Sequence, residues 1–334
     1  MSEPAAAPPT PPPVPAAAAS LVEVAALNRV FDSVHAVHDL SFAIPTGAVV
    51  GFIGANGAGK TTTMRIMATL DEPTSGNVRV AGHDVLEKPK EVRRLVGWMP
   101  DAYGTYANMN VFEYLDFFAR SYGFSREQRR ARVEEVMDFA DLTPLADRQM
   151  AKLSKGMGQR LCFGRMLIPD PEFMILDEPA AGLDPKARLE FKNLVRLLAA
   201  RGKTLFISSH ILSELGEMCD TLVFIDGGRL VFQGAADDLK HGGLPGGAAA
   251  SGMAVTVVVA GDPVAVADWA TQAPGWRVVE RRRDGARLER AGDDPADLAD
   301  GLRQMVALGI PVIEFHREQR RLEEAFVEMV KGRR

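Results

Sequence analysis

The sequence predicts an α/β protein with a parallel β-sheet covered by helices, followed by a second, smaller α/β domain. Continuous apolar runs are typical of strands that are buried on both faces, and four such runs occur at 48–54, 173–177, 204–209 and 221–226. Helical patterns lie between these runs, which is the alternation that builds a parallel sheet. A glycine-rich stretch then separates this part from further strand and helix patterns.

Composition narrows the class of protein. The chain has 334 residues, of which 46% are hydrophobic, so it can form one large domain and a smaller one with adequate cores. The net charge of −5 argues against broad nucleic-acid binding, which usually needs a strongly basic domain. The two cysteines, Cys162 and Cys219, lie among apolar residues, so we expect both in the core and exclude a disulfide framework.

Residues 1–20 are rich in proline and alanine, a composition typical of a disordered or polyproline-like tail. They lack the basic start and leucine-rich core of a signal peptide. No stretch of the chain reaches the roughly eighteen continuous apolar residues that a membrane helix needs. We therefore expect a protein that is soluble by itself, so that any role at a membrane depends on a partner.

The main domain is expected at 21–240. Its helices are predicted between the apolar strands, at 61–70, 186–200 and 211–217. The segment Asp-Gly-Gly-Arg at 226–229 resembles the turn of a β-hairpin that closes the domain.

Between about 101 and 169 the pattern is mostly helical. Val111, Leu115 and Phe118 have the spacing of one face of an amphipathic helix. We interpret this part as a helical subdomain inserted in the α/β core.

A second domain is predicted at 253–334, after a glycine-rich segment at 241–252 that has the composition of a flexible linker. Its strand-like segments are MAVTVVV, WRVVE, ARLERAG and PVIEF, and helices are expected near 295–308 and 321–331. The last helix has four apolar residues on one face: Leu322, Ala325, Phe326 and Met329. The basic run at 281–283 is interpreted as a solvated strand end, with a basic contact patch as the alternative.

A glycine-rich loop follows the first apolar strand and precedes a predicted helix. Its sequence, GANGAGKT, matches the phosphate-binding pattern G-x-x-x-x-G-K-[ST] in the context that the pattern requires. Glycines let successive backbone N–H groups face an anion, and the helix start adds partial positive charge. Lys60 is expected to bind the β- and γ-phosphates of a nucleotide, and Thr61 to hold Mg²⁺ through its hydroxyl. The predicted nucleotide-binding residues of this loop are Gly54, Ala55, Asn56, Gly57, Ala58, Gly59, Lys60, Thr61 and Thr62.

Two carboxylates end another buried strand. Asp177 stands at the strand terminus, where it can hold Mg²⁺ through water, and Glu178 can polarise a water in line with the γ-phosphate. An Asp-Glu pair can also be a turn or a helix cap, but the phosphate loop upstream favours catalysis. His210 follows a further strand at the same sheet edge and is expected to contact the γ-phosphate. The predicted catalytic residues are therefore Glu178, His210 and Lys60.

A second serine-glycine turn, LSKGMGQR at 153–160, starts another predicted helix, although one nucleotide needs only one phosphate loop. Five motifs follow one another along the chain: GANGAGKT, LSKGMGQR, DEP at 177–179, AGLD at 181–184 and His210. Together they resemble the nucleotide-binding domain of the ATP-binding cassette (ABC) transporter family. This resemblance covers about 21–234 and implies a P-loop NTPase core with a parallel sheet and an antiparallel β portion. The C-terminal part resembles the accessory domain of some bacterial exporter ATPases, whose closing helix is similar to LEEAFVEMV.

The resemblance implies that two cassettes pack head to tail and that the second turn binds the nucleotide of the other subunit. The signature that faces this nucleotide would comprise Ser154, Lys155, Gly156 and Met157. Ser154 would offer a hydroxyl and Gly156 would allow close approach of the backbone. Ser154 is also expected to cap its helix, because capping and ligand binding use the same geometry. Asp184 would line the dimer interface.

Three positions depart from the commonest pattern of the family. Lys155 replaces a glycine and Met157 replaces a glutamine, while Asp101 stands where the family has a glutamine that links Mg²⁺ to the helical subdomain. Aspartate keeps an oxygen ligand for Mg²⁺, but it adds negative charge and cannot donate an amide hydrogen bond. We expect function to survive this change. Phe31 stands about where the family stacks an aromatic residue on adenine, with core packing as the alternative.

The resemblance implies the ATPase subunit of a membrane exporter, using ATP and Mg²⁺. Its partners would be a separate transmembrane permease and a second copy of the chain or a homologous cassette. It would thus be cytoplasmic and peripheral on the inner face of the cell membrane, with no nucleic-acid partner expected. A soluble regulatory or translation-associated ABC ATPase is the alternative, although such proteins usually carry two cassettes or long coiled-coil insertions. A P-loop kinase or GTPase would explain neither LSKGMGQR nor AGLDP.

Overall fold

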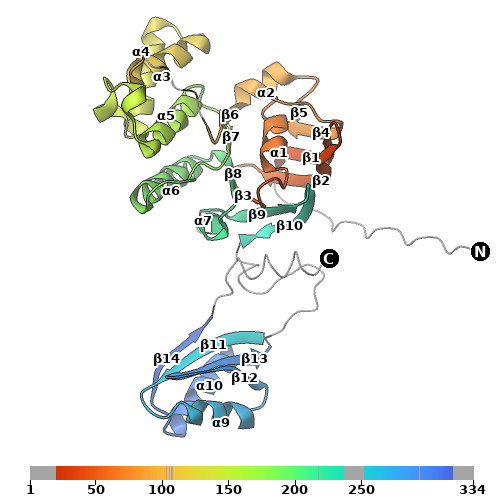
Figure 1. The fold of residues 1–334 in the computed structure, drawn as a ribbon, viewed down its shortest axis with the longest axis vertical. Helices are drawn as coiled ribbons and strands as arrows, with labels where there is room; N and C mark the ends of the chain where they lie inside the picture. Colours follow the sequence, from red (N-terminus) through yellow and green to blue (C-terminus); the bar gives the residue numbers. More distant parts are fainter. Residues whose placement is uncertain are drawn as a thin grey trace, which may run out of the picture. The chain divides into compact units, whose positions relative to one another are not determined.

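The computed structural model describes residues 20–318 except 103, 105, 107, 217, 237–251 and 293. The expected closing helix at 321–331, with its apolar face, lies outside the described residues. The chain divides into two compact units between Ala235 and Ala236 (Figure 1). Ser20 and Gly252 were expected in the tail and the linker, but each pairs with a neighbouring strand and opens β1 (Ser20–Phe31) and β11 (Gly252–Val259), respectively.

The first unit contains a six-stranded sheet in the order β10-β9-β3-β8-β7-β6. Its strands are β3 (Val49–Ile53), β6 (Val96–Met99), β7 (Phe173–Leu176), β8 (Thr204–Ser209), β9 (Thr221–Asp226) and β10 (Arg229–Ala235). Neighbouring strands are parallel except β9 and β10, which are antiparallel. Every residue of β3, β7 and β8 is buried, so the continuous apolar runs correctly predicted the central strands.

The turn between β9 and β10 consists of Gly227 and Gly228, whose φ angles are 50° and 78°. Two successive left-handed residues give a turn whose twist matches that of the strands it joins. At Gly228 a Cβ atom would lie 2.7 Å from the carbonyl oxygen of Ala36, so a larger residue has no room. The predicted hairpin is confirmed.

A second, antiparallel sheet in the order β2-β1-β4-β5 shares a core with the first. It consists of β1, β2 (Val34–Pro45), β4 (Ser75–Val80) and β5 (His83–Asp84). Phe42 on β2 stacks on Phe206 of β8 with ring centroids 5.7 Å apart, which joins the two sheets. The individual strands were not predicted, because register shifts and positive φ angles at Ala26 and Asp39 interrupt the alternation of apolar and polar residues.

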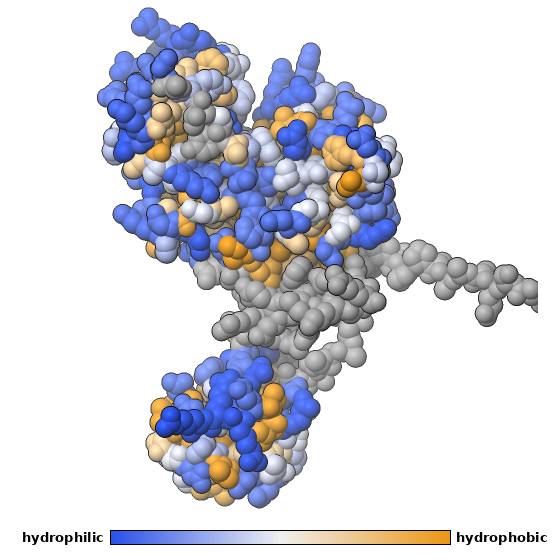
Figure 2. Space-filling view, viewed as in Figure 1, coloured by the Kyte–Doolittle hydropathy of each residue, from blue (hydrophilic) through white to orange (hydrophobic). Residues whose placement is uncertain are grey.

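The α-helices described in the first unit are α1 (Lys60–Met67), α2 (Pro89–Leu95), α3 (Val111–Ser121), α4 (Arg126–Phe139), α5 (Lys155–Leu167), α6 (Pro185–Ala200) and α7 (Leu212–Gly216). Short 3₁₀ turns lie at Thr143–Leu145 and Met150–Lys152. The predicted helical subdomain consists of α3, α4 and α5, which pack together (Figure 1). Of the predicted apolar face, Val111 and Leu115 are fully buried, whereas Phe118 is partly buried. The part of the subdomain that carries α4, at the top of Figure 2, is strongly hydrophilic. Among the helices that the structure describes, none is long and apolar enough to span a membrane.

The two cysteines are free and buried, which confirms their predicted place in the core. Cys162 lies on α5, and burial raises the pKa of its thiol to about 11. Cys219 precedes β9, and burial raises the pKa of its thiol as well. Neither thiol therefore forms the reactive thiolate near neutral pH.

In its described residues, 252–292 and 294–318, the second unit contains a four-stranded antiparallel sheet in the order β12-β13-β11-β14 and two helices. Its elements are β11, α9 (Val264–Gln272), β12 (Trp276–Arg282), β13 (Gly285–Ala291), α10 (Pro295–Ala307) and β14 (Val312–Arg317). This β-α-β-β-α-β succession is the split βαβ arrangement. The sequence predicted the four strands and α10 but missed α9, which is short and follows Pro263, a residue that provides no side-chain cap. Arg281 and Arg282 end β12 in solvent, as predicted.

Candidate functional site

The predicted phosphate loop joins β3 to α1 and borders a cavity of about 520 Å³. The cavity is lined by Phe31, Ala36, Ala55, Asn56, Gly57, Gly59, Lys60, Thr61, Thr62, Asp101, Asp177, Glu178, Ala181 and His210. Most of the predicted nucleotide, metal and catalytic residues therefore share one space. Two residues of the loop, Gly54 and Ala58, are not among the lining residues. Ala58 is buried, and its carbonyl oxygen accepts the N–H of Gly228 at 3.1 Å. A Cβ at Gly54 would meet the Ile225 carbonyl oxygen at 2.6 Å, so the close packing requires glycine.

The start of α1 is shaped to receive an anion. Gly59 precedes the helix with φ of 97°, and a Cβ there would lie 2.5 Å from the Ala36 carbonyl oxygen. Among the described side chains none caps this helix start, so its first N–H groups are available to a ligand. Free backbone donors together with the helix dipole favour a phosphate at this position.

Lys60 supplies a buried positive charge to the cavity wall. Its side chain is 6% exposed, and its Nζ atom donates to the carbonyl oxygens of Gly54 at 2.7 Å and Ala55 at 3.4 Å. The same atom lies 3.4 Å from Oε1 of Glu178. Because the loop holds the ammonium in place, a bound phosphate meets a charge that is already oriented.

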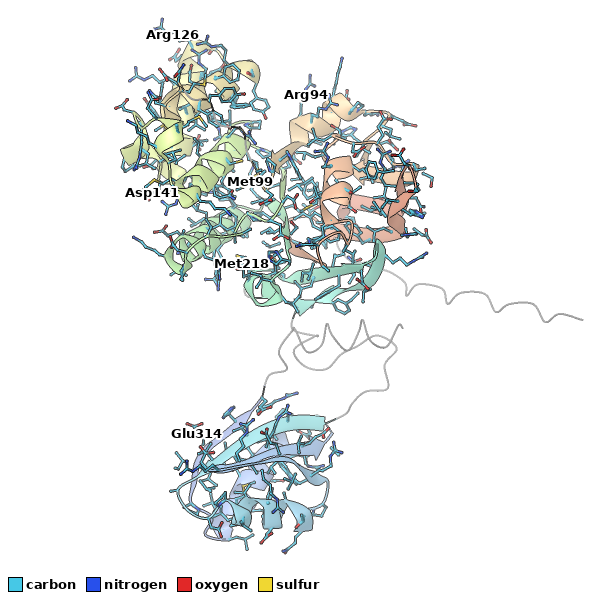
Figure 3. All side chains as sticks on the ribbon, in the orientation of Figure 1. Arg94, Met99, Arg126, Asp141, Met218 and Glu314 are labelled. Atoms are coloured by element: carbon cyan, nitrogen blue, oxygen red, sulfur yellow. The ribbon has the colours of Figure 1, made fainter. Side chains whose placement is uncertain are left out.

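Asp177 follows β7 and is almost completely buried. Its Oδ2 atom accepts a hydrogen bond from the Thr61 hydroxyl at 2.8 Å, and its Oδ1 atom accepts one from the Ser208 hydroxyl at 2.7 Å. Its backbone N–H donates to the carbonyl oxygen of Met99, which ends β6 and is labelled in Figure 3. Hydroxyl and carboxylate oxygens are the ligands that Mg²⁺ prefers, so Thr61 and Asp177 fit this ion.

Glu178 lies at the centre of the polar contacts in the cavity. Its Oε2 atom is 2.8 Å from Nδ1 of His210, and its Oε1 atom faces Lys60. Its φ angle is 48°, a left-handed conformation that costs a non-glycine residue about 1 kcal/mol or more. The surrounding contacts hold the backbone in this conformation, and such strain is concentrated at functional sites.

Ser208 connects the carboxylate of Asp177 to the backbone of Glu178 and was not predicted from the sequence. Its hydroxyl donates to Asp177 and accepts the backbone N–H of Glu178 at 2.8 Å. Ser208 is fully buried in β8, a strand whose other central residues are apolar. A hydroxyl near the end of a buried strand, two residues before His210, was the signal available in the sequence, since a buried polar group needs partners.

Phe31 lines the cavity and is 39% exposed, so it is not packed in the core; its contact with adenine stays a prediction. The guanidinium of Arg29 lies 4.2 Å from the centroid of its ring. Asp71 holds that guanidinium through an ion pair of 2.8 Å. Arg29 therefore supports one face of the ring and was also missed by sequence reasoning.

The signature turn is not part of this cavity. Ser154 caps α5 by accepting the N–H of Met157 at 3.3 Å, which confirms the predicted cap. Lys155 is exposed, and its Nζ atom would lie 2.4 Å from a Cβ at Gly182. Asp184 caps α6 in the same way as Ser154, accepting the N–H of Ala187 at 2.8 Å. The structure thus brings the phosphate loop, both carboxylates, His210, Phe31 and Asp101 together, and leaves the signature on the surface.

Comparisons with known proteins agree with this geometry. The family described as ABC transporter matches residues 37–181. The chain is 37% identical over 207 residues to the ABC transporter ATP-binding protein NatA of Bacillus subtilis, covering 62% of this chain and 84% of that protein. It is 36% identical to the Nod factor export ATP-binding protein I of Burkholderia orbicola, covering 70% and 74%. A solved ATP-binding subunit of an ABC transporter superposes with a TM-score of 0.60 at 29% identity, covering 66% and 92%.

Proposed function

The chain belongs to the ABC transporter family as an ATP-binding subunit, and from this premise we propose that it hydrolyses ATP between two cassettes to drive a separate transmembrane subunit. ATP binding closes a head-to-tail pair of cassettes, and hydrolysis reopens it. The observation that carries this proposal is the contact of Glu178 with both His210 and Lys60 at the wall of the phosphate-loop cavity.

The chain's own residues divide the reaction among them. The N–H groups of the loop from Gly54 to Thr62 and the Lys60 ammonium bind and orient the triphosphate. Glu178 accepts the proton of the attacking water, and His210 holds the carboxylate in place and reaches toward the γ-phosphate. Thr61 and Asp177 would hold Mg²⁺, with Asp101 as a further oxygen ligand; when bound, this ion offsets the charge of the phosphate oxygens.

The second cassette completes the site. Ser154 and Asp184 are helix caps on the protein surface, and a cap oxygen at a helix start can serve a ligand without losing its geometry. In the pair of cassettes the signature, Ser154 to Met157, faces the triphosphate of the other copy, and Asp184 lies at the interface. The partner is a second copy of this chain or a homologous cassette.

A permease recruits the protein to the inner face of the cell membrane. The segment after β6 carries Asp101 and Tyr106, and Tyr106 is 47% exposed. Its ring lies 6.4 Å from that of Phe117 on α3, which is 43% exposed. An exposed aromatic pair beside the cavity segment suits a protein partner that must respond to the nucleotide. The export named for the Burkholderia relative supports the outward direction of transport.

We assign 20–240 to the cassette, 241–251 to a linker and 252–334 to an accessory domain, because Ser20 and Gly252 pair with neighbouring strands. In the described part of the accessory domain, α9 and α10 pack on the sheet around a core of its own.

The proposal is tested with Glu178→Gln in the full chain. The variant keeps the size of the side chain and loses the base, so turnover is expected to fall by about a hundredfold to ten-thousandfold. ATP binding is expected to persist, and the variant is expected to accumulate as an ATP-bound dimer in size-exclusion chromatography with light scattering. Glu134→Gln, an exposed carboxylate on α4, is the matched control. Sustained hydrolysis by Glu178→Gln would refute the proposal.

A further inference from the structure

An ion pair joins α6 to α7. Helix α6 follows the 181–184 turn, and helix α7 follows the loop that carries His210. Arg188 is on α6, four residues after Asp184, and Glu214 is on α7, four residues after His210. The Arg188 Nε atom is 3.1 Å from Oε1 of Glu214. Glu214 is only 7% exposed, so its charge needs this partner, because an unpaired buried carboxylate is strongly destabilising.

Each member of the pair is also bonded to one of the two loops. Arg188 donates through Nη2 to the carbonyl oxygen of Leu183, inside the 181–184 turn, at 3.4 Å. Glu214 accepts through Oε2 from the Ser209 hydroxyl at 3.3 Å, and Ser209 in turn accepts the N–H of Ile211 at 2.9 Å. Ser209 and Ile211 flank His210. A continuous path therefore runs from the carbonyl of Leu183 to the histidine that contacts Glu178.

The pair is close in distance but not aligned as a hydrogen bond. Among the described atoms, neither Arg188 Nε nor Glu214 Oε1 has a hydrogen-bond partner, although both atoms are buried. The two side chains therefore attract each other through their charges, without a well-aligned hydrogen bond from Arg188 Nε to Glu214 Oε1. A small movement of α6 relative to α7 changes the alignment of this bond, so the strength of the pair depends on the relative position of the two loops.

We propose that Arg188 and Glu214 are positioning residues that couple the 181–184 turn to His210. This inference rests on the proposed function, in which the partner cassette contacts the turn through Asp184. When the partner displaces the turn, the carbonyl of Leu183 moves Arg188, Glu214 follows through the ion pair, and Ser209 carries the change to His210. The arrangement makes the Glu178–His210 contact sensitive to the presence of the second cassette.

The test uses Arg188→Gln, Glu214→Gln and the double variant of the full chain, with Lys203→Gln as control. Lys203 pairs with Asp170 at 2.8 Å and is a partly buried cation outside the site. We expect kcat to fall about tenfold in each variant of the pair, within the range of known coupling effects, with KM for ATP changed less than about twofold. The double variant is expected to lose about as much as the worse single variant, because the two residues act as a unit.

Two further measurements separate coupling from simple stabilisation. ATP affinity, measured by equilibrium dialysis in the Glu178→Gln background, is expected to be unchanged. Circular dichroism at the assay temperature checks folding, and Arg188→Lys, which keeps the charge beside Glu214, replaces Arg188→Gln if that variant does not fold. Arg188→Lys is expected to lose part of kcat, because a single ammonium does not serve both Glu214 and Leu183.

The coupling role and the proposed function would be overturned by different results. If kcat of the pair variants matches that of Lys203→Gln, or if the losses of the single variants multiply in the double variant, the coupling role is wrong. If Glu178→Gln still hydrolyses ATP, the proposed function itself is wrong. Loss of turnover in Glu178→Gln together with unaffected pair variants would therefore overturn the coupling alone.

Discussion

The first unit has two helix starts to compare: the phosphate loop before α1 and the signature turn before α5. They differ in how many contacts their polar side chains make with other elements of the same chain. Beside α1, Lys60 and Asp177 are buried and bonded to groups from the loop and from β8. Before α5, Ser154 is exposed, and the described contact of its hydroxyl stays within its own helix. The first start is largely preorganised within one chain, whereas the second presents its polar groups outward.

The largest effect is expected at the preorganised start. Lys60→Ala removes the ammonium that the loop holds at the cavity wall, so the developing charge on the phosphates loses its fixed counter-charge. Turnover is expected to fall by about a hundredfold or more, as when one preorganised electrostatic contact is removed. Phosphate release measures the effect, with the exposed Lys152→Ala as control. Wild-type turnover in Lys60→Ala would place the triphosphate elsewhere.

The start of α5 is tested by comparing two serines that each cap a helix. Ser154 caps α5 and Ser125 caps α4, each by accepting an N–H three residues later. Replacing either serine by alanine is expected to lower the free energy of unfolding by about 1 kcal/mol. Ser154→Ala is also expected to lower turnover about tenfold or more, because the helix start loses a ligand for the other copy's nucleotide.

Chemical denaturation and phosphate release on the same samples separate these effects. If Ser125→Ala and Ser154→Ala lose equal stability and equal turnover, the signature serine is a cap alone.

Asp101 lines the cavity of the phosphate loop and begins the segment that leads to α3 in the helical subdomain. Asp101→Ala removes one oxygen ligand but leaves Thr61 and Asp177, so the Mg²⁺ concentration for half-maximal turnover is expected to rise about tenfold. Asp101→Gln keeps an oxygen and is expected to restore most of the affinity. A magnesium titration of phosphate release measures both variants, and unchanged curves would remove Asp101 from the metal site.

The same comparison explains what the sequence predicted and what it did not. The residues of the phosphate loop and the carboxylates after β7 follow local patterns, so their grouping in one cavity was predicted correctly. Ser208 and Arg29 act through residues far along the chain, Asp177 and Asp71, and no local pattern indicates such a contact. For the fold, the buried parallel strands were predicted, whereas the bulged ladder of β1 and β2 was not, because register shifts erase its alternation.

The smallest effect is expected for the reactivity of a cysteine in the buried part of α5, after its exposed start. Cys162 is fully buried on this helix, and because its thiol pKa is raised to about 11, about one molecule in a thousand carries the thiolate at pH 8. Its reaction with a thiol reagent is therefore expected to be very slow at pH 8 and to rise as the pH approaches 11, since a raised pKa keeps the thiol protonated below that value.

Cys219→Ala isolates this signal, and the same chain in guanidinium provides the fully reactive control. Rapid labelling of the folded Cys219→Ala variant at pH 8 would mean that α5 opens along its length. The outward-facing signature would then belong to an unstable helix rather than to a fixed surface that awaits a second cassette.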